Sequence, residues 1–139
     1  MRPQPDFYIS SDRRDFDFAW IVRAIRTSYW GSWQSGEAIT LAINHSLNYG
    51  AFTRETRAQI GFIRAVTDHA TFSSITDVIV TPEWQRKGVG TALMEKLLAN
   101  PWMVPTICVL ASRDARDFYS RFRFVSVGGD VMKRSPTPT

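Results

Sequence analysis

Six residues near the middle of the chain have the composition of an anion-binding loop, Gln85-Arg86-Lys87-Gly88-Val89-Gly90. The two glycines permit backbone conformations that are closed to other residues and a close approach to a ligand. A helix is expected from Val89, so its first N–H groups and the positive end of its dipole would face one point. Arg86 and Lys87 add positive charge, and Thr91 adds a hydroxyl in the first turn. A pyrophosphate suits this arrangement, although a helix start beside a solvated Arg–Lys pair accounts for the same six residues.

Two common nucleotide motifs are excluded for this loop. It has no Gly-Lys-Ser or Gly-Lys-Thr ending of the P-loop kind, and it has no third glycine of the dinucleotide fingerprint. A phosphate-containing ligand of this loop would therefore be bound in another way, and the plain helix start stays an equal alternative.

A carboxylate interrupts the apolar strand that precedes this loop. Asp77 comes directly before Val78-Ile79-Val80. Burial favours the protonated form of a carboxyl group, so Asp77 is the leading candidate for a general base. An equally good interpretation is a structural hydrogen-bond partner for the backbone or for a neighbouring arginine. Other residues that remain open as bases are Asp68, His69 and Glu37.

These residues need a scaffold, and the hydrophobic pattern predicts alternating strands and helices. Capping residues at Ser10-Ser11-Asp12 precede the first helix, Ser35 begins the second, and Asn100-Pro101 ends the third. His45 is expected near a helix end, and Cys108 is expected to pack in a strand of the core. The predicted strands are 7–9, 48–53, 59–66, 72–80, 106–110, 124–127 and 130–133, and the predicted helices are 16–25, 35–45, 89–100 and 113–122.

Length and composition indicate one ordinary globular domain. The 139 residues suffice for a single core, which we expect over residues 1–134, with a disordered tail at 135–139. The net charge of +4 comes from arginines scattered along the chain, which speaks against a nucleic-acid patch. One cysteine, no apolar stretch of bilayer length and no signal core predict a cytoplasmic protein without a membrane partner.

Two motifs resemble those of the GCN5-related N-acetyltransferase (GNAT) superfamily. The pattern Gln/Arg-x-x-Gly-x-Gly/Ala after a buried strand is filled by Gln85, Gly88 and Gly90. Downstream, residues 114–124 are similar to the family's segment Asn/Asp-Ala-x-x-Phe/Leu-Tyr-x-x-x-Gly-Phe, except that Arg123 replaces its glycine. That glycine eases a turn, so Arg123 is expected to require an unusual backbone. The chain looks most like the small single-domain members.

The resemblance implies a fold, a co-substrate and a set of site residues. The fold is the α+β (mixed α/β) acyl-CoA N-acyltransferase fold, a mostly antiparallel twisted sheet of about six to seven strands flanked by about four helices. The co-substrate is acetyl-CoA, without a metal, and the acceptor is an amine of a small molecule or peptide. The implied cofactor-binding residues are Ile79, Val80, Gln85, Arg86, Lys87, Gly88, Val89, Gly90, Thr91 and Asp114.

The resemblance also assigns the catalytic acid and the acceptor pocket. Tyr119 takes the position of the general acid that protonates the leaving thiolate, where the alternative is one more aromatic of a helix face. Asp114 either touches the pantetheine or caps its helix, and its position favours capping. The link between the first two helices, with Tyr29, Trp30 and Trp33, implies an aromatic wall for the acceptor.

The sequence leaves three candidate functions to compare. An active N-acetyltransferase accounts for Tyr119, whereas a non-catalytic acetyl-CoA-binding sensor or interaction module does not need it. A nucleic-acid-binding domain would use the basic surplus, but the dispersed arginines disfavour it. A homodimer remains open.

Overall fold

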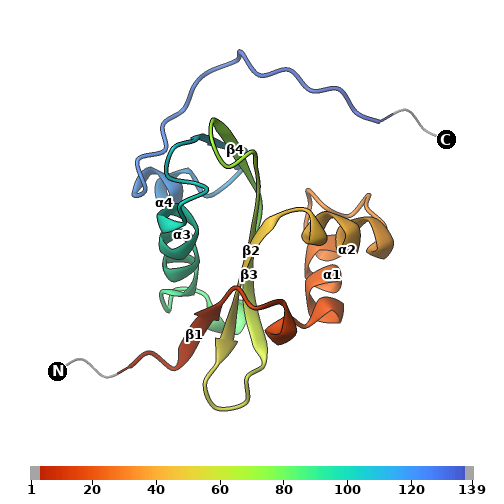
Figure 1. The fold of residues 1–139 in the computed structure, drawn as a ribbon, viewed down its shortest axis with the longest axis vertical. Helices are drawn as coiled ribbons and strands as arrows, with labels where there is room; N and C mark the ends of the chain where they lie inside the picture. Colours follow the sequence, from red (N-terminus) through yellow and green to blue (C-terminus); the bar gives the residue numbers. More distant parts are fainter. Residues whose placement is uncertain (1–3, 137–139) are drawn as a thin grey trace.

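The computed structural model describes residues 4–136, and every structural statement below refers to these residues. Five strands form one sheet in sequence order, antiparallel from β1 to β4 and parallel between β4 and β5. Figure 1 shows the sheet between two helical layers, α1 with α2 on one face and α3 with α4 on the other. The elements are β1 (Phe7–Ser10), α1 (Phe18–Thr27), α2 (Gly36–Asn44), β2 (Leu47–Thr53), β3 (Gln59–Thr67), β4 (Phe72–Val80), α3 (Val89–Ala99), β5 (Ile107–Leu110) and α4 (Arg116–Ser120).

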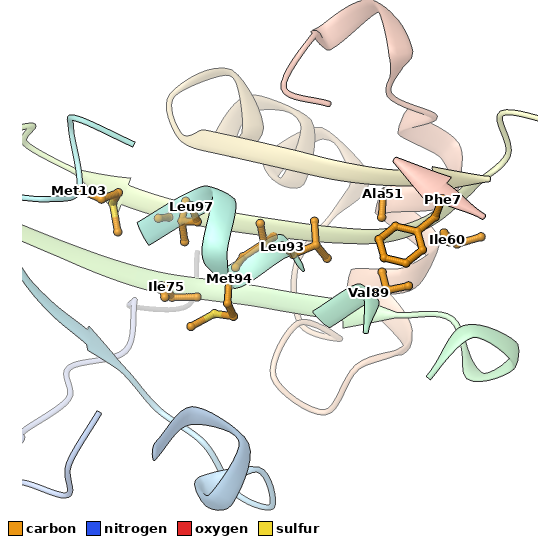
Figure 2. Close-up of a cluster of buried hydrophobic side chains, with 11 residues drawn as sticks. Phe7, Ala51, Ile60, Ile75, Val89, Leu93, Met94, Leu97 and Met103 are labelled. Carbon is orange, nitrogen blue, oxygen red and sulfur yellow. The ribbon is translucent and has the colours of Figure 1, made fainter. Parts of the chain in front are cut away.

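Each face of the sheet buries its own apolar cluster. On the α1–α2 face, Phe62 packs with four buried isoleucines, Ile21, Ile25, Ile39 and Ile43. On the other face, α3 inserts Leu93, Met94 and Leu97 against the sheet, as Figure 2 shows. The two clusters fix the sheet from both sides, so the ends of its strands are held at defined positions.

The helix starts follow from local capping. Asp17 precedes α1, and its Oδ1 accepts a hydrogen bond from the Trp20 N–H at 3.0 Å. The capping expected from Ser10-Ser11-Asp12 serves a short 3₁₀ turn at Arg13–Asp15 instead. Ser35 caps α2 as predicted, and α3 ends at Asn100 as predicted.

The two last predicted strands are absent, so the sheet has five strands rather than six to seven. Residues 124–127 and 130–133 have no strand partner, and β5 is the edge of the sheet. Arg123, at φ 68°, has the unusual backbone that its position predicts. Alternating apolar residues give a strand only where a partner strand is within reach. The mixed α/β class, the mostly antiparallel sheet and the four helices are confirmed.

A bulge divides β4 into two parts. Arg64 pairs with Asp77 and Ala65 pairs with Ile75, so the register skips Thr76. Only residues up to Ile75 pair with β5, which ends at Leu110. The second half of β4 therefore has a strand on one side only, and a gap opens between β4 and β5 beyond this point.

The disorder predicted for residues 135–139 concerns mainly 137–139, which lie outside the described residues. Within residues 4–136, no helix combines the length and the apolar character needed to cross a bilayer.

We expect Leu93→Ala to lower the free energy of unfolding by about 2–5 kcal/mol, because it leaves a cavity under the sheet. Leu93 is fully buried against β3, where Gly61 leaves room for it. Urea denaturation measures the change, and Leu41→Ala on the exposed side of α2 is the matched control, with a loss below about 0.5 kcal/mol. Equal losses in both variants would contradict the assignment of the core.

Candidate active site

Two clefts open where β4 and β5 separate, and they share four residues. The loop cleft, of about 930 Å³, contains the predicted anion-binding loop. The aromatic cleft, of about 730 Å³, contains Tyr29, Trp30 and Trp33. The residues common to both linings are Val78, Asp114, Ala115 and Tyr119. Two molecules bound side by side in these clefts would meet at this shared wall.

The two glycines of the loop act in different ways. Gly88 has φ 86° and precedes α3, and a Cβ on it would meet nothing within 4 Å, so its surroundings are open. Arg86 is also left-handed, at φ 64°. Gly90, in contrast, is helical, and a Cβ on it would lie 3.3 Å from Cζ of Phe118. We expected special backbone freedom at both glycines, but only Gly88 uses it. Position 90 suits a glycine because the Phe118 ring of α4 lies close to it and leaves little room for a larger side chain.

The other residues of the loop divide between the cleft and the core. Gln85, Arg86 and Thr91 line the loop cleft together with the two glycines. The Gln85 side chain donates from Nε2 to the Val80 carbonyl at 3.0 Å, which ties the loop back to its strand. Lys87 lies over the Trp84 ring at 5.1 Å instead, and Val89 is buried in the core. Neither of these two side chains lines the cleft, so only their backbone can serve a ligand.

The backbone of β4 offers hydrogen-bonding groups to the same cleft. The Thr81 N–H donates to the Ile60 carbonyl of β3 at 2.8 Å. Alternate residues of a strand point to opposite edges, so Ile79 also faces β3, whereas Val78 and Val80 face the gap. Val78 and Val80 line the loop cleft, and Ile79 packs toward α1 and α2. Cofactor binding by Ile79 and Val80 stays a prediction, and the geometry adds Val78 as a residue whose backbone faces the cleft.

Tyr119 lies at the junction of the two clefts. Its ring contacts Phe118 and Phe124 edge to face, with centroids 5.1 and 6.2 Å away. Burial raises the pKa of the Tyr119 phenol above its ordinary value, and the neighbouring Tyr29 phenol raises it further. The phenol is therefore protonated at neutral pH and beyond.

Asp114 does not cap α4. The residue before this helix is Ala115, without a side-chain cap, and the Ala115 N–H donates to Ser112 Oγ at 3.0 Å. Asp114 lines both clefts instead. The helix is shorter than predicted, so the carboxylate precedes its first turn and lies outside capping position.

Asp77 is buried, with 3% of its surface exposed, and both of its oxygens accept hydrogen bonds. Oδ1 accepts from Nε1 of Trp30 and Oδ2 accepts from Nε of Arg64, each at 2.7 Å. Arg64 also donates from Nη1 to Ser46 Oγ at 2.9 Å. Of the two roles open for Asp77, this geometry supports the structural one. The carboxylate fastens the α1–α2 link to the sheet through Trp30.

The α1–α2 link is also held from the far side of the cleft. The Arg113 N–H donates to the Tyr29 hydroxyl at 3.3 Å, and the Arg113 guanidinium lies 3.9 Å from the Tyr29 ring centroid. Trp33 remains largely exposed at the rim, and its Nε1 donates to the Trp30 carbonyl. Two contacts thus hold the α1–α2 link across the aromatic cleft. Trp30 is bonded to Asp77 of β4, and Tyr29 is bonded to Arg113 in the segment after β5.

The other residues considered as bases lie away from both clefts. Asp68 accepts from the N–H groups of a tight turn and from the Thr71 hydroxyl, which holds the pKa of its carboxyl well below the usual range. His69 stacks on Trp102, and Glu37 lies in the first turn of α2. Burial raises the pKa of the Cys108 thiol, which disfavours a thiolate nucleophile. Within residues 4–136, His, Cys, Asp and Glu side chains form no group of three that could hold a metal.

Several residues of the clefts are not evident from sequence motifs. Arg64 stands opposite Asp77 in the neighbouring strand, and a charged pair in two apolar strands is a signal that could have revealed it. Phe118 and Arg121 follow from the helical spacing around Tyr119 only once the helix is placed. The additional lining residues include Gln34, Arg64, Arg113, Asp117, Phe118 and Arg121.

Known proteins resemble this chain across its middle. Residues 48–126 match the family described as acetyltransferase (GNAT) domain. GCN5-related N-acetyltransferase 2, chloroplastic, of Arabidopsis thaliana is 37% identical over 73 residues, which are 51% of this chain and 28% of that protein. Histone acetyltransferase TAP1 of Glycine max is 34% identical over 84 residues, or 58% of this chain and 36% of that protein. The chain therefore spans about a third of the length of these curated relatives.

Solved structures resemble the whole fold. A protein from Xanthomonas campestris that is assigned to the GNAT family has a TM-score of 0.87 at 29% identity, and 96% of each chain is covered. An acetyltransferase-like structure from Deinococcus radiodurans has a TM-score of 0.74 at 20% identity, which covers 96% of this chain and 92% of that one. The five strands and four helices are thus arranged as in these proteins.

We expect Asp77→Ala to lower the free energy of unfolding by about 3–5 kcal/mol, because it leaves the Arg64 guanidinium buried without its partner. The double variant Asp77→Ala/Arg64→Met should recover part of this loss, since no unpaired charge stays buried. Urea denaturation of the two single variants and the double variant measures the coupling. If the losses of unfolding free energy in the two single variants add up to the loss in the double variant, Asp77 and Arg64 do not stabilise each other.

Proposed function

The chain belongs to the GNAT acetyltransferase family, and from that premise we propose that it transfers the acetyl group of acetyl-CoA to a primary amine of a small molecule or peptide. One observation carries the proposal. The loop cleft and the aromatic cleft meet at Tyr119, next to the unpaired edge of β4. A donor in one cleft and an acceptor in the other would bring their reacting atoms together beside a proton donor.

The loop cleft suits the donor. The N–H groups at Gly88 and at the start of α3 face its opening and complement a pyrophosphate. Arg86 and Arg121 line the same cleft and add positive charge. The outward backbone of Val78 and Val80 can pair with the amide groups of a pantetheine arm, as an added strand would. Such pairing draws the thioester along β4 toward Tyr119.

The shared wall suits the reaction. The amine nitrogen attacks the thioester carbonyl carbon, the C–S bond breaks, and the sulfur leaves as a thiolate. A backbone N–H of the outward β4 edge would stabilise the negative charge on the carbonyl oxygen. The Tyr119 hydroxyl gives its proton to the thiolate, for which the raised pKa keeps it available. No acyl-enzyme is required, in agreement with the core position of Cys108.

The aromatic cleft suits the acceptor. Tyr29, Trp30 and Trp33 form a wall that can pack on the carbon chain beside an amine and attract an ammonium group through the ring faces. Asp77 acts here by positioning, because it holds the Trp30 indole rather than facing the acceptor alone. Asp114 lines both clefts and is exposed, so it is the carboxylate that can take the ammonium proton, directly or through water.

We expect saturable binding of acetyl-CoA in calorimetry, weakened at least about tenfold by Gly88→Glu, which places a carboxylate at the open mouth of the loop. Ala99→Glu makes the same change of charge at the exposed far end of α3 and should bind like the wild type. Absence of binding to the wild-type protein would overturn the proposed donor site.

We expect Tyr119→Phe to lower kcat about 10²–10⁴-fold and to leave acetyl-CoA affinity nearly unchanged, because only the proton donor is removed. Release of the coenzyme A thiol in a screen of amines measures kcat. Since the pKa of Tyr119 is raised, its loss of a proton should reduce the wild-type rate only above pH 10.

Two results would count against this role for Tyr119. One is an unchanged rate in the phenylalanine variant. The other is a fall in the wild-type rate with rising pH that begins below pH 9 and is absent from the Tyr119→Phe variant. Acetyl-CoA binding without turnover of any amine would instead favour a sensor or interaction module.

A further inference from the structure

The aromatic cleft is lined by four charged residues, of which two neutralise each other. Arg64 and Asp77 form a buried ion pair, with Nε of Arg64 2.7 Å from Oδ2 of Asp77. The other two, Arg113 and Asp114, are exposed in the segment between β5 and α4. Neither of them forms an ion pair with any residue in the range 4–136. The cleft therefore presents one positive and one negative charge that a ligand can use.

The Arg113 guanidinium is held in place and keeps its hydrogen-bond donors. It lies over the Tyr29 ring, with its central carbon 3.9 Å from the ring centroid. The Arg113 backbone N–H fixes the same ring, because it donates to the Tyr29 hydroxyl at 3.3 Å. Contact with a ring face does not use the N–H groups, which lie in the plane of the guanidinium. Such a planar fork is suited to a carboxylate, which it binds through two parallel hydrogen bonds.

The two charges lie at different places along the cleft. Asp114 and Tyr119 line both clefts, so the Asp114 carboxylate belongs to the shared wall. Arg113 lines the aromatic cleft and not the loop cleft. An ammonium group attracted by Asp114 would therefore lie beside Tyr119, whereas an anionic group bound by Arg113 would lie on the acceptor side.

Apolar side chains supply much of the remaining lining. Trp30 is held by its hydrogen bond to Asp77, and Trp33 lies at the rim with 69% of its surface exposed. Ile75 and Leu110 add aliphatic surface. An exposed indole at the mouth of a cleft offers a large apolar face for packing. These residues suit an apolar side chain on the ligand.

We propose that the acceptor is a free amino acid with an apolar or aromatic side chain, whose α-amine lies beside Asp114 and whose carboxylate is bound by Arg113. This inference rests on the proposed acetyl transfer and narrows its acceptor. A simple alkylamine would leave Arg113 without a partner, whereas a zwitterion matches both charges. The N-terminal amine of a peptide has a neutral amide in place of the nearby carboxylate, so it makes no use of Arg113.

The transfer changes the amine and leaves the carboxylate ionised. The nitrogen bonds to the acetyl carbon, and the C–S bond of acetyl-CoA breaks. The ammonium group loses two protons in all, one through Asp114 to solvent and one that replaces the proton given by Tyr119 to the thiolate. The products are an N-acetyl amino acid and coenzyme A. Arg113 therefore acts in binding and orientation rather than in proton transfer.

Matched acceptors in an Arg113→Gln variant test the proposal. L-phenylalanine, L-leucine and L-methionine are each compared with their amides, which lack only the negative charge. We expect the variant to lower kcat/KM at least about tenfold for the acids, mainly through KM, and less than about twofold for the amides. Comparing wild type and variant on the same acceptor cancels differences in amine basicity.

Two further variants show whether the charge of Arg113 is responsible. Arg113→Lys should keep part of the preference for the acids, because it retains the charge but loses the planar fork. Arg23→Gln removes one positive charge from an exposed position of α1 outside both clefts, and should keep the wild-type ratio of acid to amide.

Binding measurements separate this inference from the proposed function. Calorimetry on protein saturated with coenzyme A detects amino-acid binding without turnover. Binding that depends on Arg113 but leads to no acetylation would support the amino-acid site and contradict the proposed transfer. Acetylation of the amides but not of the acids, or equal effects of Arg113→Gln on both, would overturn the amino-acid acceptor while the transfer stands. A wild-type protein that neither binds nor acetylates the three acids would also overturn it.

Discussion

The mismatch in length between β4 and β5 shapes the rest of the molecule. β4 has nine residues and β5 has four, and they pair only over the first part of β4. The bulge at Thr76 lies where this pairing stops, so the remaining backbone groups of Val78 and Val80 turn outward into a gap. Exposed edge groups normally cost stability or invite aggregation. Here they border two clefts, so an unfilled part of the sheet becomes a place to receive a ligand.

The same bulge explains the buried charge. Because the register skips one residue, Asp77 points to the α1–α2 face rather than to the α3 face, and it meets Arg64 across the strand pair. A buried ion pair adds little net stability compared with apolar residues of the same shape. The ion pair instead orients a side chain. The Asp77 carboxylate holds the Trp30 indole in place and thereby shapes one wall of the aromatic cleft.

The sequence was informative where local chemistry decides the structure. The loop Gln85–Gly90, the strand 72–80 and the cap at Ser35 depend on residues within a few positions, so their types and order could be predicted. It failed where tertiary contacts decide. The final strands were predicted from alternation, which cannot reveal whether an edge is within reach. Arg64 was missed because its importance comes from a partner 13 residues away in the chain. Gly90 was explained by backbone freedom, but its reason is the nearby Phe118 ring.

The environment of Tyr119 links the clefts to the end of the fold. Its pKa is raised mainly by burial, and Phe124, which follows α4, packs edge to face on its ring. Phe124 has no strand around it to fix its position, since the predicted strand at 124–127 is absent. Its contacts with the Tyr119 ring and with the apolar cluster on the α3 face hold it in place instead, so the phenol is buried by side-chain packing rather than by an added strand.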